Sequence, residues 1–177
     1  QAGDYEVFQI KGGLDLREGT LRFPGGRMDI LETQTIEGGT LEFGGVPTPS
    51  VVSVPAGVTL TLSASTLVHG GSGAFQGQGT VRNLGTIRAD LNGQRIWMQT
   101  TTLENVGTME ARNGGVLNLS GNWGGGGVVE RGQELPGRGS RHGLRPGGTV
   151  YAGLRTGSQG GGHLQHTLGG MVAKHGK

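Results

Sequence analysis

Carboxylates are the side chains of this sequence best suited to acid–base chemistry, since the chain has no cysteine and only five histidines. Two carboxylates that meet across one groove can cleave a glycosidic bond, one as acid and the other as base or nucleophile. The chain has four aspartates: Asp4, Asp15, Asp29 and Asp90. Their intervals are unequal, so the spacing brings no two of them to one groove. We therefore expect no catalytic residues, and a carbohydrate-active enzyme stays an alternative hypothesis.

Metal and cofactor motifs are also poorly represented. His163 and His166, in the segment "HLQH", could chelate zinc weakly, but no carboxylate lies nearby in the sequence. The segment 70–79, "GGSGAFQGQG", begins like a calcium-binding glycine-rich repeat but lacks its aspartate. The run "GGGG" at 124–127 lacks the lysine and the hydroxyl residue of a phosphate-binding loop. We predict no metal site and no cofactor.

Trp97 is the candidate ligand contact of the sequence. It lies in "RIWMQT" (95–100), where strand alternation turns Ile96 and Met98 inward and Trp97 outward. An exposed indole ring has a flat apolar face and a polar edge, which suits stacking on a sugar ring or a protein partner. Packing of Trp97 against a loop or against the C-terminal tail is the alternative.

The elements that must position these side chains are visible as internal repeats. The decamers "TVRNLGTIRA" (80–89) and "TLENVGTMEA" (102–111) are 22 residues apart, and "GTLRF" (19–23) precedes "GTLEF" (39–43) by 20. Each repeat alternates apolar and polar residues between glycine- or asparagine-rich turns, which indicates short strands. This period predicts an all-β fold, a right-handed parallel β-helix (β-solenoid) with coils of about 20–22 residues. An antiparallel β-sandwich is the alternative.

Stacking of the coils predicts ladders of side chains, because equivalent residues of successive coils lie roughly 4.8 Å apart. Four outward pairs of opposite charge are expected to stack: Arg82 with Glu104, Arg88 with Glu110, Asp90 with Arg112, and Arg22 with Glu42. Asn83 over Asn105 should form a short asparagine ladder at a turn. In the second decamer we expect Gly107 to help set the turn, and Val106 and Met109 to face the core.

The composition changes sharply near Trp123. Residues 1–123 carry eight Lys and Arg and eleven Asp and Glu, whereas residues 124–177 carry seven and two, with 18 glycines. We expect a β-solenoid over 1–123 and a glycine-rich basic tail, irregular or partly disordered, over 124–177, in which "GGTVYAG" (147–153) could add one strand. A basic segment can bind nucleic acid, but the lack of interleaved aromatic residues argues against this partner. No apolar run is long enough for a membrane-spanning helix.

The pattern "N-[LV]-G-T-[IM]-x-A", followed by "GGVLNLSG" (114–121), resembles the coils of bacterial filamentous-haemagglutinin-like exoproteins and autotransporter passenger domains. The resemblance covers residues 80–121 well and 11–79 loosely. It implies an extracellular or surface-displayed β-helix and brings no catalytic residue. We accordingly expect a non-enzymatic structural or adhesive segment of a secreted or surface protein, with glycans or host and cell-surface components as partners. A carbohydrate-binding module is an alternative. So is a self-assembling filament subunit that associates through its coil ends.

Overall fold

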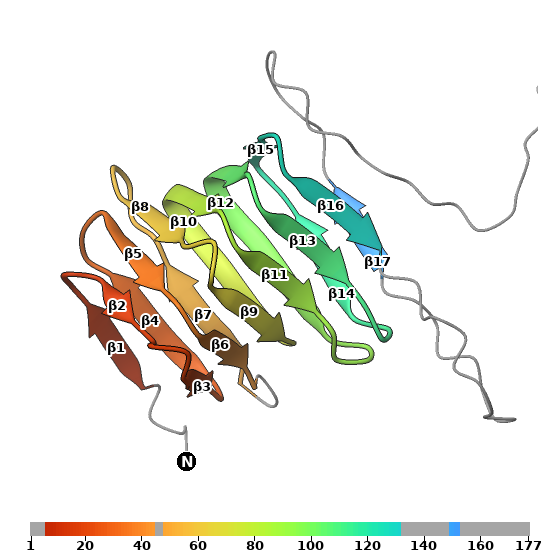
Figure 1. Cartoon of the computed structure of the whole chain (residues 1–177), viewed down its shortest axis with the longest axis horizontal. Helices are drawn as coiled ribbons and strands as arrows, with labels where there is room; N and C mark the ends of the chain where they lie inside the picture. The colour runs from red at the N-terminus through yellow and green to blue at the C-terminus, as the bar shows by residue number, and fades with distance from the viewer. Residues whose placement is uncertain (1–5, 45–47, 132–148, 153–177) are drawn as a thin grey trace, which may run out of the picture.

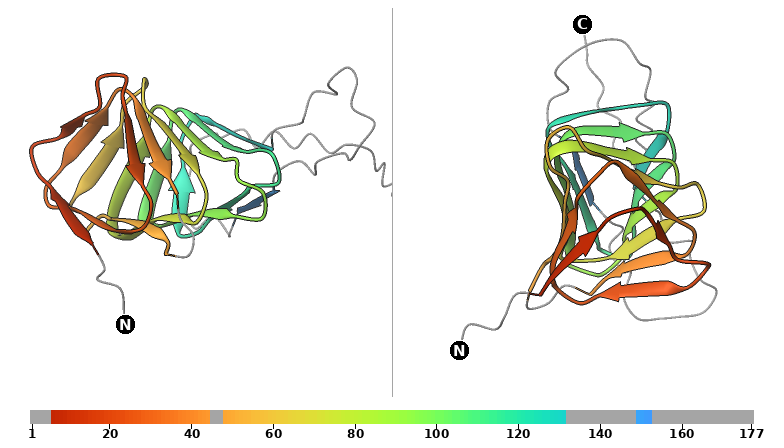
Figure 2. Two further views of the ribbon diagram at one scale, coloured as in Figure 1. Left: turned by 90° about the horizontal axis from the view of Figure 1, so that it is seen from below. Right: turned by 90° about the vertical axis from the view of Figure 1, so that its left-hand side faces the viewer.

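The computed structural model describes residues 6–44, 48–131 and 149–152, and within these ranges all regular structure is β (Figure 1). Every strand pairing in this part of the chain is parallel, which confirms the parallel β-solenoid and excludes the antiparallel β-sandwich. The strands wind through about six turns. Successive turns lie side by side along the molecule, and the view along the stack shows them enclosing one interior (Figure 2).

Each complete turn contributes a strand to each of three faces. The first face consists of β1 (Val7–Ile10), β4 (Gly26–Ile30), β7 (Ser50–Ser53), the first halves of β10 (Gly73–Asn83) and β12 (Arg95–Asn105), β14 (Val116–Leu119) and β17 (Thr149–Ala152). The second face consists of β2 (Leu14–Asp15), β5 (Gln34–Glu37), β8 (Thr59–Leu62), the second halves of β10 and β12, and β15 (Asn122–Gly124). The third face consists of β3 (Thr20–Phe23), β6 (Thr40–Phe43), β9 (Leu67–Gly70), β11 (Thr86–Ala89), β13 (Thr108–Ala111) and β16 (Val128–Arg131).

The coil length varies along the stack, although the strands keep their register. Across the first face the pairing joins residues at intervals of 20, 24, 23 and 23, in the order Val7, Arg27, Val51, Ala74 and Trp97. The middle turns are therefore longer than the expected 20–22 residues. Connections between strands absorb the difference, because only the strands must match the turn beside them.

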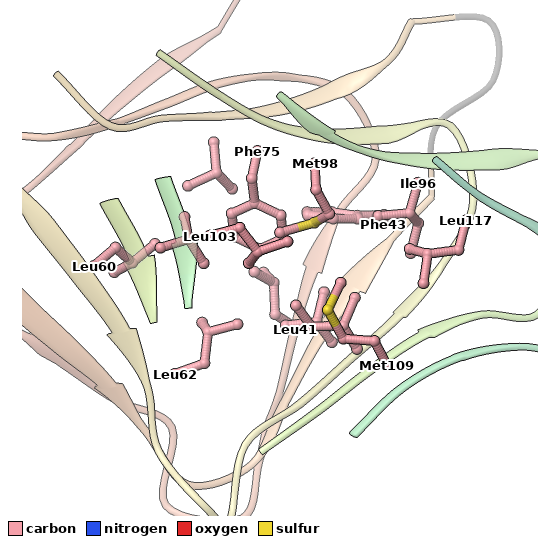
Figure 3. Packing of buried hydrophobic residues seen from close by; sticks show 14 of the residues in the cluster. Leu41, Phe43, Leu60, Leu62, Phe75, Ile96, Met98, Leu103, Met109 and Leu117 are labelled. Atoms are coloured by element: carbon pink, nitrogen blue, oxygen red, sulfur yellow. The ribbon is translucent and has the colours of Figure 1, made fainter. Parts of the chain in front are cut away.

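The core is a narrow column of aliphatic and aromatic side chains that alternate with outward residues along each strand (Figure 3). Phe8, Phe23, Phe43 and Phe75 form a continuous aromatic row through the first four turns, with successive ring centroids 6.0, 6.4 and 5.6 Å apart. The row needs a glycine at position 73, since a β-carbon there would lie 2.0 Å from the Phe43 ring. Each fully buried large apolar side chain contributes about 1.5–3 kcal/mol to folding.

The second decamer departs from expectation at one of its two predicted core positions. Met109 is fully buried, but Val106 is 47% exposed, so its predicted place in the core is wrong. The reason is the alternation in β12, where Leu103 and Asn105 face inward and the residue after Asn105 therefore turns outward.

The parallel stack continues past residue 123, where the composition changes. β16 pairs with β13, and β17, which lies in the segment "GGTVYAG", pairs with β14. Trp123 itself is buried and follows Leu103 in register on the second face. The stack therefore does not end at the composition change. The remainder of the tail, with His163 and His166, lies outside the described residues.

Candidate functional site

The outward side chains of the third face form a column of charges, one residue from each turn. In order, the column contains Arg22, Glu42, His69, Arg88, Glu110 and Glu130. The Arg22 Nε lies 3.1 Å from Glu42 Oε2, and the Arg88 Nε lies 2.5 Å from Glu110 Oε1. These ion pairs join neighbouring turns, so the charges cross-link the stack.

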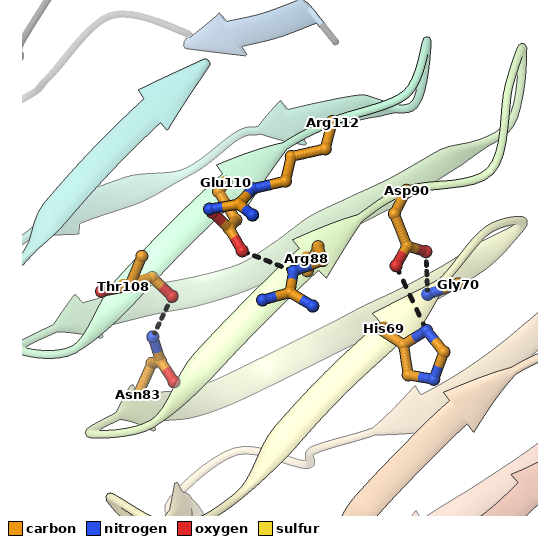
Figure 4. Close-up of polar contacts among 8 residues, drawn as sticks. All are labelled: His69, Gly70, Asn83, Arg88, Asp90, Thr108, Glu110 and Arg112. Carbon is orange, nitrogen blue, oxygen red and sulfur yellow. Dashed lines mark hydrogen bonds and ion pairs between the residues drawn. The ribbon is translucent and has the colours of Figure 1, made fainter. Parts of the chain in front are cut away.

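Glu110 is the most enclosed member of this column. Its side chain is only 2% exposed and its carboxylate also lies 2.6 Å from Arg112 Nη2 (Figure 4). Two guanidinium groups therefore enclose one buried carboxylate, which satisfies its charge and its hydrogen-bonding capacity. We interpret this cluster as structural, because both cations already have a protein anion as partner.

Asp90 does not form the expected ion pair with Arg112. The two residues are at the same level of the stack, since Arg112 N–H donates to the carbonyl of Ala89 at 2.8 Å. Asp90 instead accepts a hydrogen bond from Gly70 N–H at 3.0 Å and lies 3.3 Å from His69 Nδ1 (Figure 4). Arg112 turns to Glu110 on its own strand, so each side chain takes the partner that lies beside it.

Asn83 and Asn105 form a ladder inside the core rather than on the surface of a turn. Asn83 Nδ2 donates to Asn105 Oδ1 at 2.8 Å, and Asn105 Nδ2 donates to the carbonyl of Val128 at 3.0 Å. Both side chains are buried. The same inward column holds Leu62 and Ile36 in earlier turns. Leu62 offers no donor, and Asn83 Oδ1 accordingly has no hydrogen-bond partner among the described residues.

The second face carries the remaining expected pair and a row of hydroxyl groups. Arg82 Nε lies 3.4 Å from Glu104 Oε2, and both side chains are about half exposed. Thr59, Thr80 and Thr102 occupy one outward column beside this pair. An exposed pair of this kind contributes about 0–1 kcal/mol.

A cleft of about 510 Å³ opens on the second face at the first two turns. It is lined by Gly12, Gly13, Leu14, Asp15, Thr33, Gln34, Thr35 and Glu37. Asp15 and Glu37 are directly opposite each other in the pairing of β2 with β5. The sequence analysis considered only aspartates and missed Glu37. The interval of 22 residues between the two, equal to that of the decamers, was the signal that could have identified the pair.

The aspartates themselves do not come together. Asp15 accepts a hydrogen bond from Arg17 N–H, Asp29 lies beside Arg27 on the first face, and Asp90 is on the third face. Asp4 lies outside the described residues. Within residues 6–44, 48–131 and 149–152, no group of three or more side chains is suited to hold a metal ion. The same ranges contain no helix that is long and apolar enough to cross a membrane.

Trp97 lies on the first face at the centre of a polar patch, which we call the Trp97 surface. Ile96 and Met98 are fully buried, whereas Trp97 is partly exposed and faces outward. The surface consists of Ala74, Gln76, Arg95, Trp97, Gln99 and Asn118. The pairing places Ala74 and Asn118 on either side of Trp97, and Gln76 beside Gln99. An aromatic ring flanked by amides is an arrangement that can bind a sugar.

Comparisons with protein-family models, with curated proteins and with solved structures find no match to this chain. The fold itself defines the class, a parallel β-solenoid repeat protein with no helix in its described residues. A repeat fold of this kind does not by itself imply an activity. The function must be argued from the surfaces of the rod.

Proposed function

We propose that this chain is a non-enzymatic structural or adhesive segment of a bacterial surface or secreted protein. The observation that carries the proposal is the third-face charge column, in which Arg22, Arg88 and their glutamate partners join one turn to the next. Charges used in this way stiffen a rod and leave flat outward faces free for contact. A rod of stacked turns presents such faces at a distance from its point of attachment.

The extracellular location is supported by the resemblance of residues 80–121 to coils of bacterial exoproteins. Brief protease treatment of intact cells that produce the chain tests this location, with mass spectrometry of the released peptides. We expect peptides from the solenoid to be released before any cytoplasmic marker. Protection of these peptides until the cells are lysed would overturn the extracellular part of the proposal.

The adhesive part is tested by a glycan-array screen of the purified chain, combined with a reducing-sugar assay on every glycan that binds. Binding without release of new reducing ends supports adhesion. Release of sugar would overturn the non-enzymatic assignment. The two assays together separate a binding surface from a carbohydrate-active enzyme.

A carbohydrate-active β-helix enzyme is the second candidate, and the acidic cleft favours it. Asp15 and Glu37 are the one pair of directly opposed carboxylates in the described cleft, and a sugar chain could lie between the threonines that line it. Asp15→Asn and Glu37→Gln test this role. If the wild-type chain releases sugar and each variant loses that activity while it keeps the fold, the enzyme replaces the adhesive rod.

A self-assembling filament subunit is the third candidate, and the first turn favours it. Val7 is 54% exposed and Phe8 is 46% exposed in β1, an edge strand with a described neighbour on one side only. An exposed apolar edge strand is a template for pairing with another chain. Light scattering over a range of concentrations tests association, and Phe8→Lys should reduce it. A strictly monomeric protein would exclude the filament.

A further inference from the structure

We infer that the Trp97 surface binds an acidic polysaccharide, one whose sugar residues carry carboxylates. The inference rests on the proposed adhesive function and names the surface and the ligand class. It starts from the position of Trp97 on a flat parallel sheet, where it faces outward between Ala74 and Asn118. Ala74 has a small side chain and is 7% exposed, so it leaves the neighbourhood of the indole ring low and open to a flat ligand.

The amides next to Trp97 supply hydrogen bonds that suit sugar hydroxyl groups. Gln76 and Gln99 are adjacent in register, so their side chains repeat at the strand spacing of about 4.8 Å. Asn118 continues the row beside Trp97 on the next turn. Each amide offers both a donor and an acceptor, as a hydroxyl group does. An extended sugar chain that runs along the rod therefore meets a repeated set of matching partners.

The charge of the surface selects an acidic ligand. Arg95 is exposed and, by strand alternation, lies on the same side of β12 as Trp97, two residues away. Among the described residues it forms no ion pair, whereas Arg22, Arg82 and Arg88 all have a glutamate partner. The Trp97 surface contains no aspartate or glutamate. A guanidinium group in this setting can bind a carboxylate through two hydrogen bonds.

A polysaccharide fits these observations better than a nucleic acid does. Nucleic-acid surfaces neutralise several phosphates with rows of lysine and arginine, and stack successive bases on several aromatic rings. The Trp97 surface has one cation and one aromatic ring among four small or amide-bearing residues. It therefore matches a ligand with sparse charge and many hydroxyl groups.

The experiment is a titration of the full chain by calorimetry and by tryptophan fluorescence. The chain has two tryptophans, and only Trp97 is partly exposed, so a ligand on this surface should change the fluorescence of Trp97. The probes are polygalacturonate, alginate and hyaluronan. The neutral comparison is fully methyl-esterified polygalacturonate, and a single-stranded polynucleotide is the competing polyanion. Circular dichroism checks that each variant keeps the fold.

We expect at least one acidic polysaccharide to bind, and Trp97→Ala and Arg95→Gln each to weaken it by about tenfold. Trp97→Phe keeps an aromatic ring and should retain most of the affinity. Arg82→Gln removes the same charge from the second face and should leave the affinity unchanged. Added salt should weaken the wild-type chain and have much less effect on Arg95→Gln.

Other outcomes would overturn the inference. Equal binding of the methyl ester would refute the carboxylate preference, and equal or tighter binding of the polynucleotide would refute the polysaccharide class. Unchanged affinity in both Trp97→Ala and Arg95→Gln would refute the surface, while binding by the wild-type chain would still support adhesion. Failure of the wild-type chain to bind any acidic probe would refute the inference. If the glycan array is also negative, the adhesive function fails with it.

Discussion

Arg88 donates a charge-assisted hydrogen bond to Glu110 on the next turn, and the receiving side chain is almost completely buried, at 2% exposure. A charge-assisted bond in a site that excludes water is stronger than one on the surface. Its loss leaves a buried carboxylate with less compensation. The link between turns four and five is therefore stronger here than at the exposed pair on the second face.

Arg88→Gln should destabilise the solenoid by about 1–3 kcal/mol, because Glu110 then depends on Arg112 alone for a charged partner. Urea unfolding followed by circular dichroism measures the change. Arg82→Gln is the matched control, since it breaks an equivalent pair between the same two turns at half exposure, and it should cost about 1 kcal/mol or less. Equal costs for the two variants would contradict the distinction.

The asparagine ladder should show coupling between its two members. Asn83→Leu and Asn105→Leu each place in the column the residue type found in the turn below, at Leu62, but each leaves its former partner with an unmet hydrogen bond. The double variant removes both polar groups. We expect it to be less destabilising than the sum of the single variants by about 1 kcal/mol, measured as a double-mutant cycle. Strict additivity would show that the Asn83–Asn105 hydrogen bond contributes nothing.

Gly73→Ala should be strongly destabilising, because the new β-carbon would meet the ring of Phe43 at 2.0 Å. Overpacking of this kind typically costs about 1–3 kcal/mol. Phe43→Leu removes part of the ring and should recover some of the stability of Gly73→Ala in the double variant. Gly126→Ala is the control, because nothing lies within 4 Å of the place its new β-carbon would take, and its melting temperature should change little.

Glu37→Gln should stabilise the first two turns slightly, by about 0.2–1 kcal/mol, because like charges directly opposite each other on neighbouring strands repel. The gain should be largest at low ionic strength and should shrink as salt screens the repulsion. Thermal unfolding at two salt concentrations measures it. A loss of stability would show that Glu37 has a favourable partner that outweighs Asp15.

Much of the architecture can be predicted from the repeated decamers. Arg82 and Glu104 occupy the same place in two copies of one motif, and the pairing of β10 with β12 joins them directly. The register follows from the motif because identical turn residues recur at each corner of the stack. Asp15 and Glu37 obey the same rule, but their local sequences differ too much for a motif to reveal them.

The amino-acid sequence by itself determined the parallel stack and its register, because alternating side chains between glycine turns can bury their apolar face only by stacking. The tertiary structure alone decided which partner each side chain takes. Asp90 turns to His69 and Gly70 rather than to Arg112, and the Asn83–Asn105 ladder lies in the core with Val106 outside it. These choices depend on distances across the turns, which no interval along the chain specifies.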